Sequence, residues 1–517
     1  QVVSNRAAGV QFRREAAKKI GADGDMNLFY AQEPALVETE EEFNTEAYDA
    51  IIENPFKTAR ENPLSTFSID VDTASYANMR RFLTEGQLPP PGSIRIEELV
   101  NYFTYNYPSP TGDKPFSVYP EVAQCPWAPE HLLVRIGLKG KEIDPGSRPK
   151  SNFVFLLDVS GSMNARNKLP LVKEGLKLLV NQLTPDDRVA MVVYAGASGL
   201  VLPSTEGTDK QAIIEALDRL NAGGSTNGGE GIELAYKTAR ENFIQGGVNR
   251  VILCTDGDFN VGATSQDRLA RLIEDKAKSG VFLSVLGFGM GNYKDSTLEK
   301  LADKGNGNYA YIDTGKEARK VLVEQMSGTL VTIAKDVKIQ VEFNPARVEA
   351  YRLIGYENRM LAKEDFNDDT KDAGEIGAGH TVTALYEIIP AGKKADVPPV
   401  DELKYQVTVP LPEAGQSNEL LTIKLRYKQP DGETSRLLEF PLTAEDTRLE
   451  YATDDFKFAS AVAAFGMLLR GSEHSGEATF EGIQNMAYSS KGEDRHGYRQ
   501  EFVELIGRAM ELTPAKE

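Results

Sequence analysis

The stretch from Asn152 to Met163, N-F-V-F-L-L-D-V-S-G-S-M, decides both the fold and the candidate site. Its apolar first half is typical of a strand buried on both faces in a parallel sheet. The strand ends at Asp158, and Ser160 and Ser162 follow at once on a tight loop. The sequence therefore predicts one carboxylate and two hydroxyls that point at one spot, at the carboxyl end of a buried strand.

Strand-like and helix-like segments alternate around this stretch, between residues 151 and 330. The further apolar runs are RVAMVVYA, RVILCTDG, VFLSVLGFG and NYAYID, and helices are expected from Leu169, Asp209, Gly228, Ser265 and Lys316. Apolar strands separated by amphipathic helices predict a doubly wound, Rossmann-like α/β domain, with a parallel sheet covered on both faces.

Two more oxygen-bearing residues belong to the same predicted site. In the strand order 3-2-1-4-5-6, ligands bind between the first and fourth strands, so Asp256 is expected across from Asp158. Thr226 follows in the glycine-rich loop A-G-G-S-T-N. Oxygen ligands with few carboxylates suit a hard cation such as Mg²⁺. Serines that merely cap a strand end are the alternative, but the order of Thr226 and Asp256 on predicted loops argues against it.

These five residues resemble the metal-ion-dependent adhesion site of von Willebrand factor type A domains. The resemblance implies that Ser160 and Ser162 bind the metal directly, that Asp158 and Asp256 act largely through water, and that Thr226 does either. A cation with few direct carboxylates stays electrophilic and can take a carboxylate from a protein partner. The resemblance thus implies a non-enzymatic, divalent-cation-dependent adhesion or adaptor protein, with Mg²⁺, Mn²⁺ or Ca²⁺ bound.

The flanks resemble a bacterial family in which an N-terminal region precedes the A domain and a C-terminal domain of unknown function follows it. The stretches that carry this likeness are STFSIDVDTASYANMRRFL from Ser65, DAGEIGAGHTVTALYEI from Asp372 and FASAVAAFGMLLR from Phe458. In A domains the last helix can shift and change the affinity of the site. Residues 316–330, which lead into a strand near Val337, are therefore the expected lever.

We expect a multidomain α/β plus β chain. The predicted parts are a flexible or loosely docked arm at 1–60, a helical module plus β strands at 61–150, the A domain at 151–330, a β-sandwich-like domain at 331–448 and a helical segment at 449–517. Period-two strands on both sides of the A domain predict that it is inserted into one sandwich. The last segment is expected to pack against that sandwich.

Composition excludes some partners. The formal net charge is -19, which repels phosphate backbones and anionic lipids, so neither nucleic acid nor bare membrane is an expected partner. No apolar run reaches the roughly 18 residues of a membrane span. Cys125 and Cys254 are too few to indicate a redox compartment. Because the chain begins at Gln1, we expect a removed signal peptide or lipoprotein anchor, and hence export.

Several other patterns are set aside. The run from Asp256 to Gly262 resembles an EF-hand loop but has Val261 where that loop needs glycine. The glycines around Gly289 follow the fifth strand and lack the nucleotide fingerprint, so no nucleotide is expected. Four scattered histidines indicate no hydrolase. Asp70 and Asp72 could form a second oxygen-rich site, but an Asp or Thr that caps the next helix explains them more simply.

The aromatic residues Tyr102, Phe103, Tyr105 and Tyr107 are interpreted as packing rather than as a ligand groove. Two other functions stay open. One is a structural or assembly protein of the bacterial envelope, in which the metal only stabilises the fold. The other is a metal-assisted enzyme, against which the lack of a recognisable base or nucleophile argues.

Overall fold

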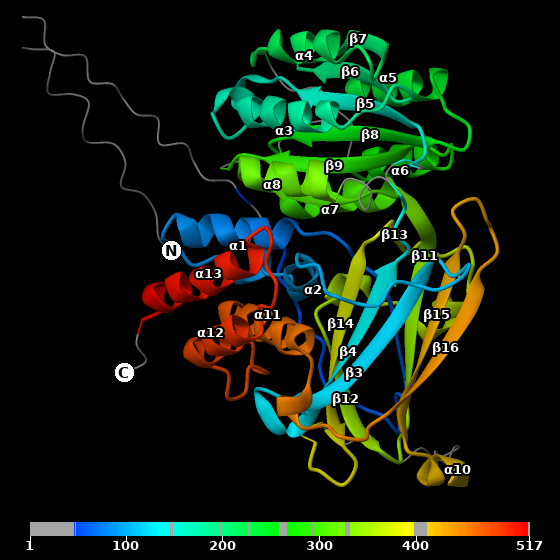
Figure 1. Ribbon diagram of the computed structural model, residues 1–517, viewed down its shortest axis with the longest axis vertical. Coiled ribbons are helices and arrows are strands. Elements are labelled where there is room, and N and C mark those ends of the chain that lie inside the picture. Colours follow the sequence, from blue (N-terminus) through cyan, green and yellow to red (C-terminus); the bar gives the residue numbers. More distant parts are fainter. Residues whose placement is uncertain are drawn as a thin grey trace, which may run out of the picture. The chain divides into compact units, whose positions relative to one another are not determined.

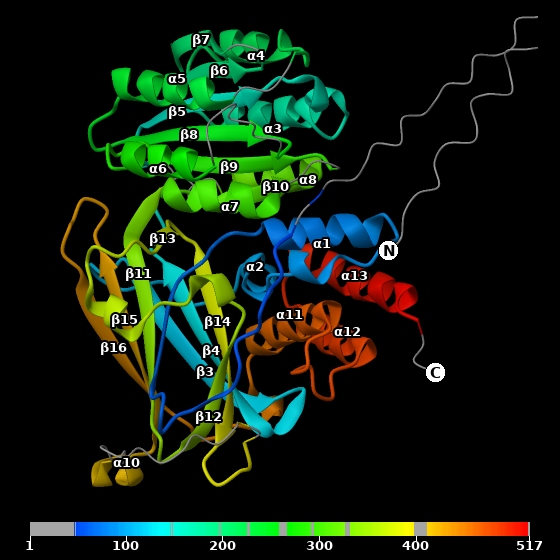
Figure 2. The same cartoon turned by 180° about the vertical axis from the view of Figure 1, so that it is seen from behind.

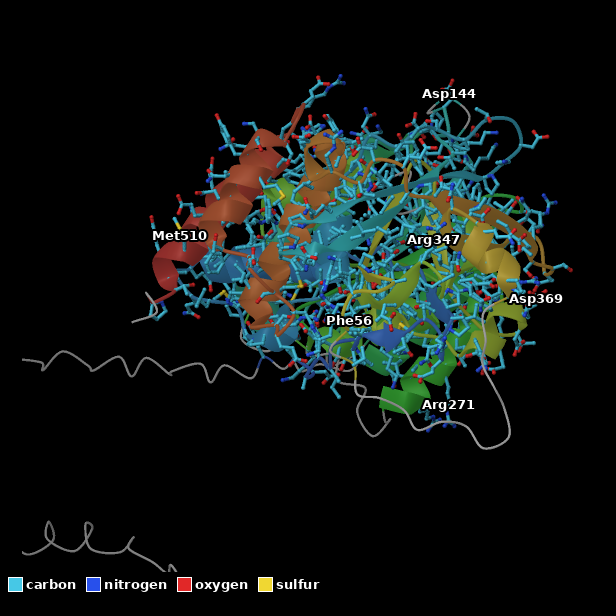
Figure 3. All side chains as sticks on the ribbon, turned by 90° about the horizontal axis from the view of Figure 1, so that it is seen from below. Phe56, Asp144, Arg271, Arg347, Asp369 and Met510 are labelled. Carbon is cyan, nitrogen blue, oxygen red and sulfur yellow. The ribbon has the colours of Figure 1, made fainter. Side chains whose placement is uncertain are left out.

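The computed structural model describes residues 46, 48–144, 146, 148–195, 198–224, 228–257, 266–290, 294–325, 331–395, 397 and 411–514. Most of the arm predicted at 1–60 lies outside these ranges. Its last part packs on the β domain, where the Asn54 side chain donates to the carbonyls of Leu353 and Gly355. Phe56, labelled in Figure 3, packs its ring against His131 and His474.

The A domain contains a six-stranded sheet with the order β7-β6-β5-β8-β9-β10. The strands are β5 (Ser151–Asp158), β6 (Arg188–Tyr194), β7 (Ser198–Glu206), β8 (Val248–Thr255), β9 (Phe282–Phe288) and β10 (Tyr309–Ile312). This is the predicted doubly wound order, and the prediction of the fold is confirmed. The expectation of an all-parallel sheet is wrong at one edge, because β7, which the sequence did not suggest, runs antiparallel to β6.

Helices cover both faces of this sheet, as Figures 1 and 2 show from opposite sides. One face carries α3 (Leu169–Asn181), α4 (Lys210–Asp218) and α8 (Gly315–Arg319), and the other carries α5 (Gly228–Glu241), α6 (Gln266–Ala277) and α7 (Asp295–Lys304). Along β5, Phe153 and Phe155 pack on the first face, whereas Val154 and Leu156 pack on the second. A strand buried on both faces explains why the run is apolar throughout.

Two sheets form the β domain. One has the order β1-β12-β14-β4-β3 and the other the order β13-β11-β15-β16, with β2 paired to β11. The strands are β1 (Lys57–Thr58), β2 (Leu64–Ser68), β3 (Phe116–Cys125), β4 (Ala128–Gly140), β11 (Thr332–Phe343), β12 (Val348–Ile354), β13 (Gly374–Gly377), β14 (Thr381–Pro390), β15 (Glu419–Lys428) and β16 (Arg436–Thr443).

The pairing of β4 with β14 joins chain from before the A domain to chain from after it, with Val134 opposite Tyr386. The predicted insertion of the A domain is therefore confirmed. Apolar residues of both sheets, such as Ile136 and Ile339, share one core. The strand expected in LKYQVTVPLP, from Leu403, falls almost entirely outside the described residues.

Helices from the two ends of the described chain form one cluster. They are α1 (Ala74–Thr84), α2 (Ile96–Asn101), α11 (Asp454–Arg470), α12 (Phe480–Ser489) and α13 (Tyr498–Leu512). Tyr76 and Leu99 of the first pair pack with Phe465 and Phe502 of the last three. The expectation that the tail packs on the sandwich was incomplete, because α11 lies against α2 and α13 against α1.

Short helical segments complete the described elements. They are η1 (Pro91–Ser93), η3 (Gly161–Asn164), η4 (Lys320–Glu324, a π-helical continuation of α8), η5 (Glu357–Arg359), η6 (Lys363–Asn367), α10 (Pro412–Gln416) and η7 (Leu449–Tyr451). None of the helices in the described ranges has the length and apolar character that crossing a bilayer requires.

Candidate metal centre

Asp158 and Asp256 lie at the same edge of the A-domain sheet. Asp158 is the last residue of β5, and Asp256 directly follows β8. The two strands are parallel neighbours, with Leu157 opposite Cys254. Both carboxylates therefore leave the sheet at its carboxyl edge, at the point where the strand order reverses, as the sequence predicted.

The loop after β5 turns two hydroxyls toward each other. Oδ1 of Asp158 accepts a hydrogen bond of 2.9 Å from the backbone N–H of Ser160, and this bond closes the loop onto the strand end. The hydroxyl oxygens of Ser160 and Ser162 then lie 3.0 Å apart. Three of the five predicted ligands are thus held in one turn.

The glycine-rich loop that leads to Thr226 runs beside this turn. The backbone N–H of Gly161 donates to the carbonyl of Gly224 at 3.0 Å, and that of Gly223 donates to the carbonyl of Val159 at 2.8 Å. Thr226 itself lies outside the described residues. The described chain reaches Gly224, two residues before it, where its carbonyl meets the backbone of Gly161.

The carboxylate of Asp158 is buried and strongly constrained. Its Oδ2 accepts hydrogen bonds from the hydroxyls of Tyr194 at 3.1 Å and Thr255 at 3.2 Å. Burial, which strips hydration from the charged form, and the negative charge of Asp256 together raise the pKa of Asp158 to about 6, against the hydrogen bonds from Ser160 and Tyr194, which lower it. A cation placed here would relieve both effects.

Asp256 has a partner that the sequence did not reveal. Nζ of Lys168 donates to Oδ2 of Asp256 at 2.9 Å, and both side chains are buried. Lys168 comes ten residues after Asp158, outside the D-x-S-x-S pattern, so no spacing rule indicates it. Tyr194 and Thr255 were missed as well, although Thr255 stands in the T-D-G run.

The described donors fit a small divalent cation. Mg²⁺ is bound by oxygen at about 2.0 to 2.1 Å in octahedral geometry, which places adjacent ligands about 3 Å apart. The separation of the Ser160 and Ser162 hydroxyls is 3.0 Å. The four described candidates, Asp158, Ser160, Ser162 and Asp256, are all oxygen donors, as a hard cation requires.

The second oxygen-rich run does not behave as predicted. The N-cap residue of α1 is Thr73, but its side chain makes no capping hydrogen bond. Glu98 takes that role instead, accepting from the N–H of Ser75 at 2.7 Å, and Asp72 accepts from the N–H of Tyr309. Local sequence favoured a cap by an Asp or Thr. In the structure, the Glu98 carboxylate of α2 binds the N-terminus of α1 in its place.

Asp70 joins an acidic cluster with Glu98 and Glu299, whose oxygens lie within 4.8 Å of one another. Two guanidinium groups form ion pairs with it. Arg359 contacts Asp70 and Glu299, and Arg95 contacts Glu98 and Glu299. The cluster is an ion-pair network that connects the helical module, α7 and the β domain.

Other patterns contribute no site. Asp258, Asn260 and Gly262 of the EF-hand-like run lie outside the described residues. Tyr102, Phe103, Tyr105 and Tyr107 are all buried in the helical core, as interpreted, although the same four residues also line a hollow of about 850 Å³.

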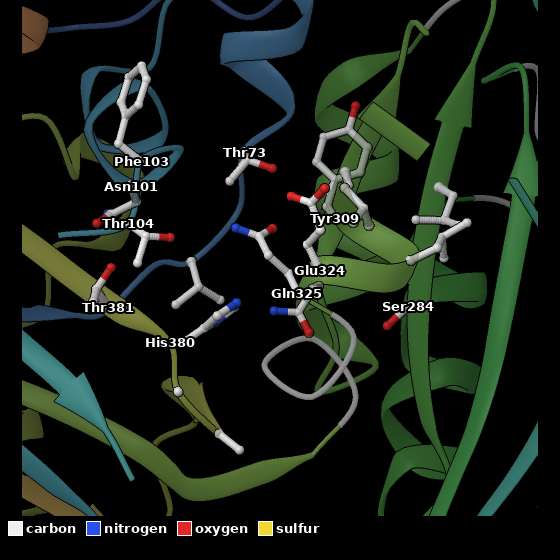
Figure 4. A pocket seen from close by; sticks show the side chains of 18 of the residues that line it. Thr73, Asn101, Phe103, Thr104, Ser284, Tyr309, Glu324, Gln325, His380 and Thr381 are labelled. Carbon is white, nitrogen blue, oxygen red and sulfur yellow. The ribbon is translucent and has the colours of Figure 1, made fainter. Parts of the chain in front are cut away.

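A cavity of about 230 Å³ lies where the A domain meets the helical module and the β domain (Figure 4). Phe103, Ser284 and His380 each supply part of its wall. None of the four described metal-ligand candidates lines it.

Comparison with known proteins shows which family models match parts of the chain. A family model for the von Willebrand factor type A domain matches residues 152–325, and one described as von Willebrand factor matches residues 42–135. A model described as "Uncharacterized protein YfbK, C-terminal" matches residues 328–512. Together with the doubly wound sheet, these matches define a von Willebrand factor type A domain protein.

The particular family follows from one relative. The chain is 46% identical over 476 residues to the YfbK protein of Escherichia coli (strain K12), covering 91% of this chain and 82% of that protein. The chain belongs to this family, in which a von Willebrand factor type A domain is joined to a YfbK C-terminal domain.

Two further likenesses have lower identity. Human inter-alpha-trypsin inhibitor heavy chain H4 is 29% identical over 180 residues, 33% of this chain and 18% of that protein. A solved structure, von Willebrand factor type A from Catenulispora acidiphila, is 17% identical with a TM-score of 0.42 and covers 75% of this chain and 89% of that one.

Proposed function

We propose that this chain is a divalent-cation-dependent protein-binding protein. Mg²⁺, or Mn²⁺ or Ca²⁺ in its place, would be held by Asp158, Ser160, Ser162, Thr226 and Asp256, and would accept a carboxylate from a partner protein. The bound cation supplies an electrophilic coordination position. Von Willebrand factor type A domains often mediate protein interactions, which supports this class of function over an enzymatic one.

One observation carries the proposal. The turn after β5 holds the Ser160 and Ser162 hydroxyls 3.0 Å apart, beside two buried carboxylates from neighbouring strands. Burying Asp158 and Asp256 together is costly unless a cation compensates the charge. Lys168 carries one positive charge and pairs with Asp256, and a bound metal would add positive charge beside both carboxylates.

We also propose that α8 transmits the state of the site to the rest of the chain. Arg80 of α1 contacts Asp313 and Glu317, at the start of α8, at 2.5 and 2.8 Å. Part of the predicted lever, residues 326–330, lies outside the described residues. A crosslink between α8 and α1 should change metal affinity, and unchanged affinity would contradict this coupling.

The proposed function is tested by measuring which proteins of an extract the immobilised chain retains. The wild-type chain and an Asp158→Ala variant are immobilised, and extract of the source organism is passed over each in Mg²⁺ or in EDTA. A protein held only by wild type in Mg²⁺ is the expected result. Partners held regardless of metal and mutation would instead favour a structural or assembly role, with the metal acting on stability alone.

A further inference from the structure

Lys168 approaches the candidate metal centre from the start of α3. Its Nζ donates to Oδ2 of Asp256 at 2.9 Å, and the two side chains are 9% and 0% exposed. Removing one partner of a buried ion pair leaves an uncompensated charge. The lysine is therefore part of the electrostatics of the site.

Gly289, the residue after β9, has no side chain and so leaves the space that the Lys168 side chain occupies. Gly289 has φ +75°, and a Cβ there would lie 2.4 Å from Cε and 2.5 Å from Cγ of Lys168. The hydroxyl of Tyr311 donates to the Gly289 carbonyl at 2.5 Å and holds this backbone in place. Gly289 and Tyr311, both more than a hundred residues from Lys168 in the sequence, thus fix the surroundings of its side chain.

Formal charges show what this lysine would do. Among the described ligand candidates, Asp158 and Asp256 are the two carboxylates, and together they neutralise one divalent cation. Counting only Asp158, Asp256, Lys168 and the metal, the loaded centre carries one net positive charge, which a partner's carboxylate cancels. Without it, the same carboxylate would leave a buried negative charge, which is unfavourable at low dielectric.

We propose that Lys168 is a fixed internal cation that sets the ligand preference of this site. It weakens binding of the bare divalent cation and strengthens capture of a carboxylate by the metal-loaded site. This inference rests on the metal-dependent function proposed above. It makes Lys168 a specificity-determining residue that need not touch the metal.

The test compares metal binding with carboxylate binding. Mn²⁺ is titrated into the full chain, with free Mn²⁺ measured by electron paramagnetic resonance. Acetate is then titrated onto the loaded protein, with displacement of metal-bound water measured by proton relaxation. Lys168→Met should bind Mn²⁺ roughly tenfold more tightly and acetate roughly tenfold more weakly. Lys177→Met, which removes a half-exposed lysine from the same helix, should change neither.

Two further variants test the same proposal if Lys168→Met does not fold. Lys168→Arg retains the charge and should stay closer to wild type than Lys168→Met in both titrations. Gly289→Ala displaces the lysine stem and should shift both affinities in the same directions as Lys168→Met. Gly86→Ala is its control, because Gly86 has the same φ of +75° with nothing within 4 Å of the added Cβ.

The outcomes separate the two proposals. Mn²⁺ binding that is lost in Asp158→Ala but unchanged or weakened in Lys168→Met would overturn only the role of Lys168. Mn²⁺ binding that survives Asp158→Ala, or its absence from wild type, would overturn the proposed function and this inference with it.

Discussion

The phenol oxygen of Tyr194 lies 3.1 Å from Oδ2 of Asp158 and donates a hydrogen bond to it. Tyr194 ends β6 and stands opposite Asp158 in the sheet register. Gly231 of α5 leaves the space that the Tyr194 side chain needs, because a Cβ at Gly231 would lie 2.9 Å from Cβ of Tyr194. The carboxylate is thus oriented by a neighbouring strand as well as by its own loop.

Replacing Tyr194 by Phe should lower the free energy of unfolding by about 1 to 2 kcal/mol, because a buried carboxylate oxygen loses a donor. Urea unfolding in metal-free buffer measures the change. Tyr488→Phe is the control, since Tyr488 is 61% exposed. Equal stability of Tyr194→Phe and wild type would mean that this hydrogen bond does not stabilise the site.

Ser162→Ala should abolish most of the stabilisation that Mg²⁺ gives the wild-type chain. A cation at 100 times its Kd adds about 2.7 kcal/mol to the free energy of unfolding, and the variant lacks one proposed ligand. Thermal unfolding with and without Mg²⁺ measures the difference. Ser489→Ala, at an exposed position of α12, should respond like wild type. An undiminished Mg²⁺ effect in Ser162→Ala would argue that the cation binds elsewhere.

Arg80→Met should lower the free energy of unfolding by about 3 to 5 kcal/mol. The substitution leaves Asp313 and Glu317, 6% and 1% exposed, without their shared counter-ion. Urea unfolding at neutral pH tests this. Arg495→Met removes a guanidinium that is 78% exposed and should change stability by less than about 0.5 kcal/mol. Similar effects of the two substitutions would contradict the stabilising role of the Arg80 ion pairs.

Lys320 predicts a pH dependence of stability. Burial lowers the pKa of Lys320 from 10.5 to about 7, despite the nearby charge of Glu317. Between pH 7 and 10 the unfolded chain therefore binds a proton that the folded chain does not. The contribution of this group to the free energy of unfolding must rise with pH over that window.

The measurement is urea unfolding of wild type and Lys320→Met at pH 7, 8 and 9. Stability of wild type relative to the variant should increase with each step, because Met does not titrate. A constant difference across the three pH values would show that Lys320 has an ordinary pKa in the folded chain.

The parts of the fold that follow from sequence are those with one strong period. Continuous apolar runs predicted β5, β6, β8 and β9, and period-two alternation predicted strands of the β domain on both sides of the A domain. The edge strand β7 was missed because Gly199 and Pro203 interrupt its pattern. The joint helical core was missed because Tyr76 and Phe502 are more than 400 residues apart, and no local pattern reports that contact.

The candidate site also has residues that the sequence predicts and residues that it does not. Asp158 and Asp256 could be paired from sequence because a doubly wound sheet fixes which strands are neighbours. Lys168 could not, since its approach depends on the length of the η3 turn and on the bare backbone at Gly289. Side chains that act through another residue leave no spacing rule in the sequence.

The most direct test of the account is an anomalous difference map from crystals grown with Mn²⁺. The metal-site assignment predicts a single strong peak at the carboxyl edge of the A-domain sheet, about 2.2 Å from the hydroxyl oxygens of both Ser160 and Ser162. The same crystals of Asp158→Ala should lack it. A map with no peak there, or with the ion bound elsewhere on the chain, would contradict the central claim.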